Sequence, residues 1–233
     1  MWKIIEGSVP QMLAAGFKYT IPLAIISFFF GLILALITAL VRLSKKGGFF
    51  LIIKWIFGFY VWLFRATPLL VQLFIVFFGL PYLKIKGIFP NGIKLEPFTA
   101  GVITFSLNTG AYASETIRAA ISSVPQGQWE AGMSMGMSKL RTLWRIILPQ
   151  AFRVALPPLS NSFISLVKDT SLAASITIME MFAVSQQLAA ENYQPLLMYS
   201  LVALIYAAFT SVLTLLQKYL EQVTGRHVNT EQN

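Results

Sequence analysis

The sequence predicts an all-α polytopic membrane protein with about five transmembrane helices, and three observations lead to this prediction. Of the 233 residues, 56% are hydrophobic and only 12% are charged, whereas a soluble domain has about 25% charged residues. Several segments have the roughly 20 predominantly apolar residues that a helix needs to cross a bilayer. The excess of Lys and Arg, with a formal net charge of +9, lies mainly between these segments. In a membrane protein this excess indicates cytoplasmic loops rather than nucleic-acid binding.

The first apolar segment, residues 20–41, contains no charged side chain and ends before Arg42. It is too long for the apolar core of a signal peptide, which has about 7–15 residues, and no small-residue cleavage site follows it. We therefore expect this segment to remain in the mature protein as a transmembrane helix. Residues 1–19 are expected to form an amphipathic lead-in on the outer side.

Residues 49–83 are apolar, but they could cross the membrane once or twice. This stretch is longer than the roughly 20 residues of one span, and Lys54, Arg65 and Pro68 interrupt it. In the one-span reading, Thr67 caps a helix that opens with Pro68 at its first position, where a missing N–H costs nothing. The preceding residues then lie at the membrane interface or start the span early.

The other predicted spans are residues 98–121, 159–179 and 195–220, and the basic residues decide the total number. With five spans and the N-terminus outside, most Lys and Arg residues lie on the inner side, as the positive-inside rule requires. A second crossing within residues 49–83 would move the basic segment 118–153 outside. The inner residues are then Arg42, Lys45, Lys46, Lys54, Arg65, Arg118, Lys139, Arg141, Arg145, Arg153, Lys218 and Arg226, and the outer ones are Lys3, Lys18, Lys84, Lys86 and Lys94.

This orientation predicts a transmembrane domain at residues 20–220 in the cell membrane and a cytoplasmic tail at residues 221–233. The chain has no cysteine, and its single histidine, His227, lies in that polar tail. Thiolate nucleophiles, histidine-rich metal sites and a Ser/His dyad within the membrane therefore lack the residues they need. We expect no metal site, and we expect His227 to be a solvated tail residue.

Residues 122–158 form the longest polar connection, and their pattern is helical. A short helix over 128–136 is expected to end at Gly136, and Ser138 is expected to cap a second helix over 139–148. That second helix has Leu140, Leu143, Trp144 and Ile147 on one face, which is amphipathic spacing. Pro149 and the pair Pro157-Pro158 are expected to limit it. The sequence therefore predicts a folded cytoplasmic docking element.

This connection resembles a loop of binding-protein-dependent ABC importer permeases, which has the pattern E-A-A…G…I-x-L-P. Gly132 replaces the second alanine and should loosen the first helix, because glycine costs about 1 kcal/mol of helix propensity. Residues 65–72, Arg-Ala-Thr-Pro-Leu-Leu-Val-Gln, resemble a signature of the polar amino acid branch, with Ala66 in place of its glycine. Residues 106–121 and 157–174 look most similar to cystine permeases. The residues that match the loop pattern are Glu130, Ala131, Gly132, Gly136, Ile146, Leu148 and Pro149.

The resemblance implies a type I ABC importer permease fold and a non-catalytic subunit that forms the path for a polar L-amino acid, with cystine as a candidate. It implies that residues 122–158 couple the chain to two copies of a cytoplasmic ATPase, which carry ATP and Mg²⁺. An extracytoplasmic substrate-binding protein and a second permease subunit, identical or related, are the other implied partners, besides membrane lipid. The glycines of the loop lack P-loop spacing, so we expect no ATP site and no cofactor in this chain.

Ionisable side chains at membrane depth are costly and indicate function. Lys168 lies about 15 Å along a helix from Pro158, near the middle of the bilayer, and Asn108 reaches a similar depth from the opposite side. Asp169 is predicted to receive the ammonium group of a zwitterionic substrate, with Asn108 and hydroxyl groups holding its carboxylate or side chain. The alternative for Lys168 is a structural ion pair with a carboxylate on another helix. The predicted path residues are Asn108, Tyr112, Ser165, Lys168 and Asp169.

Glu115 and Arg118, three residues apart near the cytoplasmic end of their helix, are predicted to form a structural pair rather than a substrate site. The alternative class for the whole chain is an ATP-independent secondary carrier or channel for small polar solutes. That class accounts for the intramembrane charges but not for the loop pattern, and the sequence shows no inverted repeat of the kind many carriers have. A membrane enzyme is less favoured, because cysteine, a placed histidine and a carboxylate pair are missing.

Overall fold

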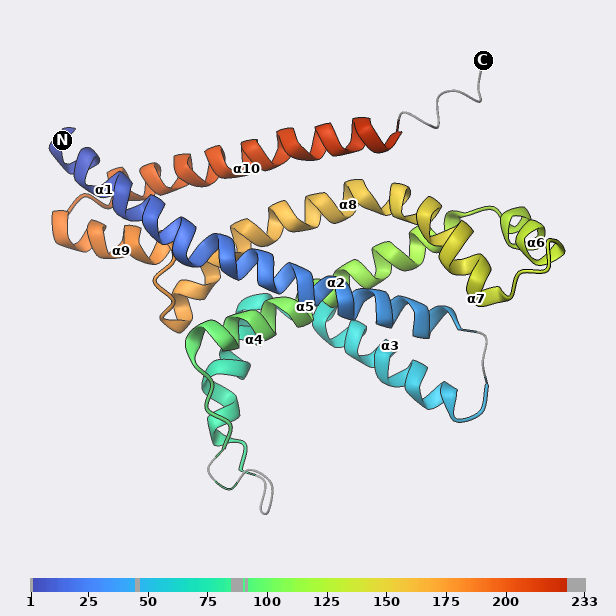
Figure 1. Cartoon of the computed structure of the whole chain (residues 1–233). Helices are drawn as coiled ribbons and strands as arrows, with labels where there is room; N and C mark the ends of the chain where they lie inside the picture. The colour runs from blue at the N-terminus through green and yellow to red at the C-terminus, as the bar shows by residue number, and fades with distance from the viewer. Residues whose placement is uncertain (1, 45–46, 85–89, 91, 226–233) are drawn as a thin grey trace.

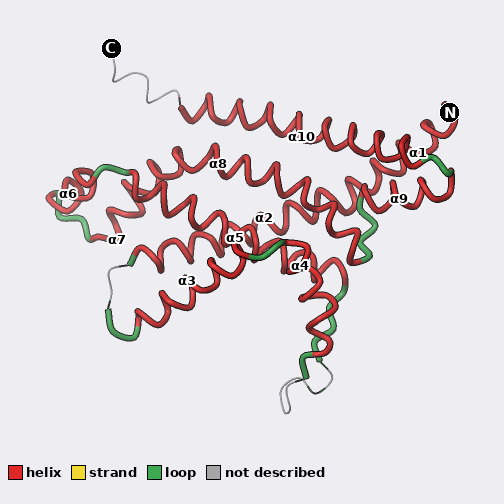
Figure 2. The backbone as a smooth tube through the Cα atoms, turned by 180° about the vertical axis from the view of Figure 1, so that it is seen from behind, coloured by secondary structure: helices red, strands yellow, loops and turns green. Residues whose placement is uncertain are grey.

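The computed structural model describes residues 2–44, 47–84, 90 and 92–225, and all regular secondary structure in these residues is helical (Figure 1). The prediction of an all-α protein is confirmed. The long helices α2, α5, α8 and α10 form an elongated bundle, and the short helices α6 and α7 lie at one end of it. The start of α1 and the helix α9 lie at the opposite end (Figure 2).

The N-terminal part is one continuous helical stretch of 42 residues, Trp2–Leu43. It consists of α1 (Trp2–Ala15), a π-helical turn (Gly16–Thr20) and α2 (Ile21–Leu43). At about 1.5 Å per residue this stretch is about twice as long as a bilayer core is thick. The boundary expected at residue 19 therefore does not coincide with a break in the backbone. The placement of residues 1–19 outside the membrane stays a prediction.

The stretch at residues 49–83 is a broken helix, with α3 (Phe50–Ala66) and the following helical segment bent by 111°. That segment comprises α4 (Leu69–Phe74), a π turn (Ile75–Gly79) and a 3₁₀ turn (Leu80–Tyr82). The prediction that Pro68 opens the second helix is wrong, because Pro68 is extended, with ψ 137°, and α4 begins at Leu69. A residue before proline is driven to extended backbone, and Thr67 has φ −114° and ψ 146°.

Helix α5 (Pro97–Ser123) packs along α2 through small residues. A Cβ added at Gly31 of α2 would lie 2.9 Å from the Cβ of Thr109 and 3.2 Å from the carbonyl oxygen of Ser106. Close backbone approach through small residues is the usual way helices pack in a bilayer, where the hydrophobic effect between helices is weak. The α2–α5 pair is therefore the central contact of the fold.

The connection after α5 forms two short helices, α6 (Gln126–Ser134) and α7 (Lys139–Thr142). From α7 the chain continues without a break through a π turn (Leu143–Ile147) into α8 (Leu148–Asp169). The prediction that prolines limit the second loop helix is therefore wrong. The ring of Pro149 would clash with the carbonyl four residues earlier in a regular α-helix, and the wider π turn lies at that place.

After α8 the chain forms a 3₁₀ turn (Thr170–Ile176), bends by 54°, and continues as α9 (Met181–Asn192) and α10 (Pro195–Gly225). Helices α1, α9 and α10 share one apolar core cluster. The predicted span at 159–179 therefore ends in a 3₁₀ turn, and the predicted tail at 221–233 begins inside α10. His227 lies outside the described residues. The principal buried side chains of the shared cluster are Met12, Met181, Leu188, Met198 and Val202.

Two stretches are long and apolar enough to cross a membrane, Trp2–Leu43 and Pro195–Val223, and the two bent helix pairs raise this number to four. The 27-residue helix α5 is not in this set, although at 1.5 Å per residue it is about 40 Å long. With α5 counted, the described helices agree with about five spans. Large apolar side chains are exposed on the outer faces of α2, α3 and α10, as expected of helices in contact with lipid.

Candidate functional site

Helix α8 carries an exposed polar stripe near its C-terminal end, while its other face is buried in the core. Asn161, Ser165, Lys168 and Asp169 are exposed, whereas the neighbouring side chains of Leu166 and Val167 pack in the core cluster of α2, α4 and α5. In the part of the chain that the structure describes, neither Lys168 nor Asp169 has an ion pair. A structural pair between Lys168 and a carboxylate on another helix is therefore not found among these residues.

Asn108, the predicted path residue on α5, contacts the break between α3 and α4 instead of the stripe on α8. Its side-chain amide nitrogen donates to Oε1 of Gln72 at 2.9 Å and, more weakly, to the carbonyl of Phe64 at 3.5 Å. Gln72 in turn donates from Nε2 to the carbonyls of Phe64 and Thr67 and to the hydroxyl of Thr67, at 2.9–3.0 Å. The two amides thus satisfy carbonyl groups that the break removes from helical hydrogen bonding.

Tyr112 lies beside Asn108 at the same break. Its hydroxyl donates to the carbonyl of Arg65 at 3.5 Å, and the guanidinium of Arg65 lies 5.6 Å from the centre of the Tyr112 ring. The hydroxyl of Tyr60 on α3 also donates to α5, to the carbonyl of Leu107 at 2.5 Å. The structure therefore brings Asn108 and Tyr112 together. Helix α4 contacts the 3₁₀ turn that follows Asp169, so this group and the α8 stripe belong to neighbouring elements.

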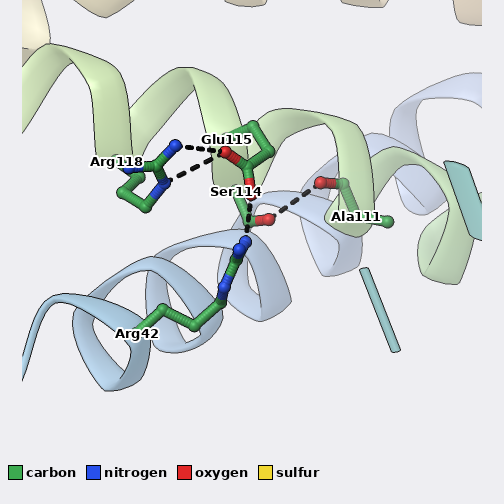
Figure 3. Close-up of polar contacts among 5 residues, drawn as sticks. All are labelled: Arg42, Ala111, Ser114, Glu115 and Arg118. Carbon is green, nitrogen blue, oxygen red and sulfur yellow. Dashed lines mark hydrogen bonds and ion pairs between the residues drawn. The ribbon is translucent and has the colours of Figure 1, made fainter. Parts of the chain in front are cut away.

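Glu115 binds two arginines from two helices (Figure 3). Its Oε2 accepts from Nε of Arg118 at 3.0 Å and from Nη2 at 2.7 Å, and its Oε1 accepts from Nη1 of Arg42 on α2. The carboxylate is largely covered, with 18% of the side chain exposed. One carboxylate between two guanidinium groups carries a net charge of +1, and the cluster joins α2 to α5. Sequence reasoning gave the Glu115–Arg118 pair but missed Arg42, which is 73 residues away.

The connection between α6 and α7 is built from two local motifs. Gly136 has φ +77°, the left-handed backbone that favours glycine at the end of a helix. The N–H of Met137 donates to the carbonyl of Gly132 at 3.1 Å, and the N–H of Gly136 donates to Met133 at 2.9 Å, which is the Schellman pattern. The hydroxyl of Ser138 then accepts from the N–H of Arg141 at 3.3 Å and caps α7.

The residues of the loop pattern are divided between the surface and the interior of this element. Glu130, Ala131 and Pro149 are exposed, and Gly132 is buried. Ile146 and Leu148 are half-buried and pack against the core cluster of α5 and α8. Four large apolar side chains remain exposed at the tip, and we call them the apolar tip. Its members are Met133, Met135, Leu140 and Trp144.

The four residues predicted to share one face of the second loop helix are also divided. Leu140 and Trp144 are 65% and 54% exposed, whereas Ile147 is fully buried and Leu143 packs against the core. The π turn at Leu143–Ile147 explains this difference, because its extra residue per turn rotates the side chains relative to α-helical spacing.

A buried carboxylate that sequence reasoning missed lies between α8 and α9. Glu180 is 0% exposed, and it caps α9 by accepting from the N–H groups of Phe182 at 2.9 Å and Ala183 at 2.7 Å. The hydroxyl of Tyr206 on α10 donates to the same carboxylate at 2.6 Å. An acidic residue alone in an apolar run, just before helical spacing resumes, was the available signal. In the described residues, no group of acidic or histidine side chains could hold a metal ion.

The comparisons with known proteins agree with these features. The sequence profile described as "Binding-protein-dependent transport system inner membrane component" matches residues 47–226. The L-cystine transport system permease protein TcyB of Bacillus subtilis is 50% identical over 97% of this chain and 92% of its own length. The glutamine transport system permease protein GlnP of Escherichia coli is 34% identical, over 95% of this chain and 96% of its own.

Solved structures agree with the same assignment. A chain in a crystal structure of an amino acid ABC transporter with histidines has a TM-score of 0.80 at 30% identity, and the match covers 91% of this chain and 94% of that one. An inward-facing structure of the MetNI methionine ABC transporter, at 17% identity and TM-score 0.69, shares the fold over 96% of this chain and 97% of that one.

The chain belongs to the family of binding-protein-dependent transport system inner membrane components. It is therefore a permease component, a non-catalytic membrane subunit, and the resemblance inferred from the loop at residues 130–149 is confirmed.

Proposed function

We propose that this chain forms the substrate path of an ATP-driven importer for polar amino acids and that α6 and α7 couple it to a separate cytoplasmic ATPase. The observation that carries the coupling proposal is the apolar tip. Its exposed side chains lie on a compact, capped element at one end of the bundle. An exposed apolar patch rimmed by polar residues typically marks a protein contact, and an amphipathic helix normally binds in a groove.

The orientation that we propose for the chain rests on the charges at the end of the bundle that holds α6 and α7. The C-terminal end of α10 lies at the end that holds α6 and α7 (Figure 1). Lys139, Arg141, Arg145 and Lys218 belong to these elements. By the positive-inside rule this end faces the cytoplasm, where an ATPase with bound ATP and Mg²⁺ would dock. The opposite end, with α9, faces the extracytoplasmic binding protein.

For the substrate path we propose the exposed stripe on α8. Lys168 and Asp169 are exposed, adjacent and opposite in charge, and charges at membrane depth persist only where water, a partner or a substrate solvates them. A zwitterionic amino acid supplies both complementary charges, with its ammonium group on Asp169 and its carboxylate near Lys168. Asn108 and Tyr112 then shape the neighbouring wall of the path at the α3–α4 break. A second permease subunit, identical or related, closes the path.

Cystine is the first substrate to test, because the relative named as an L-cystine permease is 50% identical to this chain. Binding and uptake are compared for cystine, arginine, glutamine and histidine, using the complex of the chain with its ATPase and its binding protein. Uptake of cystine but not of the others supports cystine as the substrate. Uptake of one of the other amino acids alone would identify that amino acid as the substrate instead.

The coupling proposal is tested with Glu130→Lys in vesicles, where ATP hydrolysis and uptake are measured on the same preparation. We expect hydrolysis to continue while uptake per ATP falls, because the charge is reversed on the exposed face of α6. Glu221→Lys, the same reversal on α10 and outside α6 and α7, is the matched control. Unchanged coupling in Glu130→Lys and in Gly136→Trp contradicts the proposal. Uptake without any co-purifying ATPase favours the ATP-independent carrier instead.

A further inference from the structure

Helix α6 touches the helix that starts at Lys139 at one point of very close approach, at Gly132. A Cβ added at Gly132 would lie 2.6 Å from Cγ2 and 2.9 Å from Oγ1 of Thr142. The terminal carbon of Ile146 would lie 3.1 Å away. Thr142 is fully buried, so its side chain cannot turn out into solvent.

The neighbouring structure prevents Thr142 from moving away. Threonine is branched at Cβ, and its side chain has few allowed positions in a helix. Its Oγ1 also donates to the carbonyl of Ser138 at 3.1 Å, inside the cap of α7. The carbonyl of Gly132 is fixed as well, because it accepts from Met137 in the Schellman motif. A side chain at position 132 would therefore displace α6 rather than Thr142.

The two other glycines of this element have different roles. The effect of the contact at Gly132 can therefore be tested separately from the effect of a glycine backbone. Gly136 is required by its left-handed backbone, and a Cβ there would meet no atom within 4 Å. Gly127, in the same helix as Gly132, has neither constraint, because its backbone is α-helical and a Cβ would meet nothing within 4 Å. Only Gly132 is thus limited by the size of a partner side chain.

We infer that Gly132 and Thr142 form a size-matched contact that sets how α6 is oriented on the α7–α8 helix. This contact, which we call the Gly132–Thr142 lock, determines how Glu130 and Met133 on α6 are placed relative to Leu140 and Trp144 on the surface that faces the ATPase. Gln128, one turn before Gly132 on the same face of α6, is tied to the start of α8 through its hydrogen bond with Gln150 at 3.3 Å. The lock explains why glycine replaces alanine in the loop pattern of this chain, despite its low helix propensity.

Gly132 and Thr142 are therefore positioning residues for coupling, a role that rests on the proposed docking of the ATPase. Gly132→Ala should raise the helix propensity of α6 and yet lower uptake per ATP hydrolysed by about tenfold, the size expected of an overpacked contact. Thr142→Ala removes the two nearest of the three atoms that a Cβ at position 132 would meet, so Gly132→Ala/Thr142→Ala should recover coupling. Gly132→Ala/Thr142→Ser, which keeps Oγ1, should recover it only in part. Gly127→Ala is the matched control and should couple normally.

The orientation of α6 is measured independently of transport. The chain contains no cysteine, so spin labels attached to Gln126→Cys and Arg153→Cys, both at exposed positions, report the distance between α6 and α8. We expect this distance to shift in Gly132→Ala, to return in the double variant and to stay constant in Gly127→Ala. All variants are compared at equal amounts of folded chain in the membrane, so a folding defect does not count as uncoupling.

Three results overturn the inference. They are an unchanged label distance in Gly132→Ala, normal coupling in Gly132→Ala, and a coupling defect in Gly132→Ala that Thr142→Ala does not relieve. Glu130→Lys separates this failure from failure of the proposed function. Uncoupling by Glu130→Lys together with normal coupling in Gly132→Ala rejects the lock alone, whereas normal coupling in both variants rejects the docking of the ATPase on this element.

Discussion

At the scale of single residues, the exposed Lys168 and Asp169 differ from the more covered charges Glu115 and Glu180. Glu115 is held by two arginines and Glu180 by three hydrogen-bond donors, so their charges already have partners. Among the described residues Asp169 has no hydrogen bond or ion pair, and only the charge of its sequence neighbour Lys168 acts on it. An unpaired carboxylate at membrane depth is costly, and binding of a cationic group is the simplest compensation.

Asp169→Asn tests this assignment. The change keeps the shape of the side chain but removes the charge, and a hydrogen bond to a charged group is worth about 1.5–3 kcal/mol, or roughly tenfold or more in affinity. Uptake by the complete complex should fall by this factor across amino acids with an α-ammonium group. Glu221→Gln, the same neutralisation on α10, should leave uptake unchanged. Normal uptake by Asp169→Asn for every amino acid tested would reject the site.

The requirement for glycine at position 136 is purely conformational. Its φ of +77° is unfavourable for a residue with a Cβ, by about 1–2 kcal/mol for most residues, although no neighbouring atom would be touched. Gly136→Ala should therefore loosen the end of α6. The expected sign is faster hydrogen exchange at the backbone N–H groups of residues 136 and 137. Asparagine tolerates this backbone, so Gly136→Asn should exchange more slowly than Gly136→Ala. Equal exchange in the two variants would contradict this reason for glycine.

Glu180 acts as a cap and as a link between helices at the same time. Glu180→Ala leaves the N–H groups of Phe182 and Ala183 and the hydroxyl of Tyr206 without this acceptor, and each unsatisfied buried donor costs about 1–3 kcal/mol. We expect a lower thermal stability of the purified chain in detergent. Tyr206→Phe removes only one of the three hydrogen bonds and should cost less. If Tyr206→Phe is as unstable as Glu180→Ala, the main contribution of Glu180 to stability comes from its hydrogen bond with Tyr206 and not from the cap of α9.

At the scale of the elements, the break between α3 and α4 is stabilised by side chains far away in the sequence. Pro68 forces the preceding residue out of helical geometry. The carbonyls that are freed accept hydrogen bonds from the side chains of Gln72 and Asn108. Because Gln72 donates to these carbonyls and accepts from Asn108, the two amides form one network. The contributions of Gln72 and Asn108 to the free energy of unfolding should therefore not be additive.

A double-mutant cycle measures this coupling. Gln72→Ala and Asn108→Ala should each destabilise the chain, and the double variant should lose less than the sum of the two, with an interaction energy of about 0.5–3 kcal/mol. The measurement is thermal or denaturant unfolding of the purified chain. The pair Gln150→Ala and Asn108→Ala, in which the two residues share no hydrogen bond, is the control and should be additive. Additivity in the Gln72 cycle would contradict the network.

The elements also show which parts could be predicted from the sequence. Gly136 and Ser138 obey local rules for helix ends, so the division between α6 and α7 followed from the sequence. Proline did not give a reliable prediction, since Pro68 interrupts a helix but Pro149, Pro157 and Pro158 lie within one. The outcome depends on how the freed backbone groups are satisfied. At Pro149 a π turn keeps the helix continuous, whereas at Pro68 the amides of Gln72 and Asn108 bind the freed carbonyls of a broken helix. Arg42 and Gln72 were missed because their partners lie on other helices, whereas Glu180 caps its own helix and only Tyr206 lies on another one.

At the scale of the whole molecule, the helices form groups that hydropathy alone could not distinguish. One core lies among α2, α4, α5 and α8, and another joins α1, α9 and α10. Glu180 joins α9 to α10 within the second group, because it caps α9 and binds Tyr206. The two groups are linked where the N–H of Met181 donates to Thr20, directly before α2, at 3.4 Å. Apolar residues in a membrane protein face either a core or lipid, so the sequence predicts spans but not which of them pack together.

The orientation of this assembly in the membrane is testable because the chain has no cysteine of its own. Ser134→Cys, at the end of α6, and Glu191→Cys, near the end of α9, introduce single thiols at exposed positions at opposite ends of the bundle (Figures 1 and 2). In intact cells a thiol reagent that cannot cross the membrane should label Glu191→Cys and spare Ser134→Cys. The basic residues of α7 and of the end of α10 determine this direction.

After the cells are opened, the same reagent should label both variants, which shows that Ser134→Cys is reactive and only shielded by the membrane. Labelling of Ser134→Cys in intact cells, with Glu191→Cys protected, would reverse the chain and put α6 and α7 on the side where no ATP is available. Because coupling to a cytoplasmic ATPase needs this end inside, the labelling pattern tests the coupling proposal before any substrate is known.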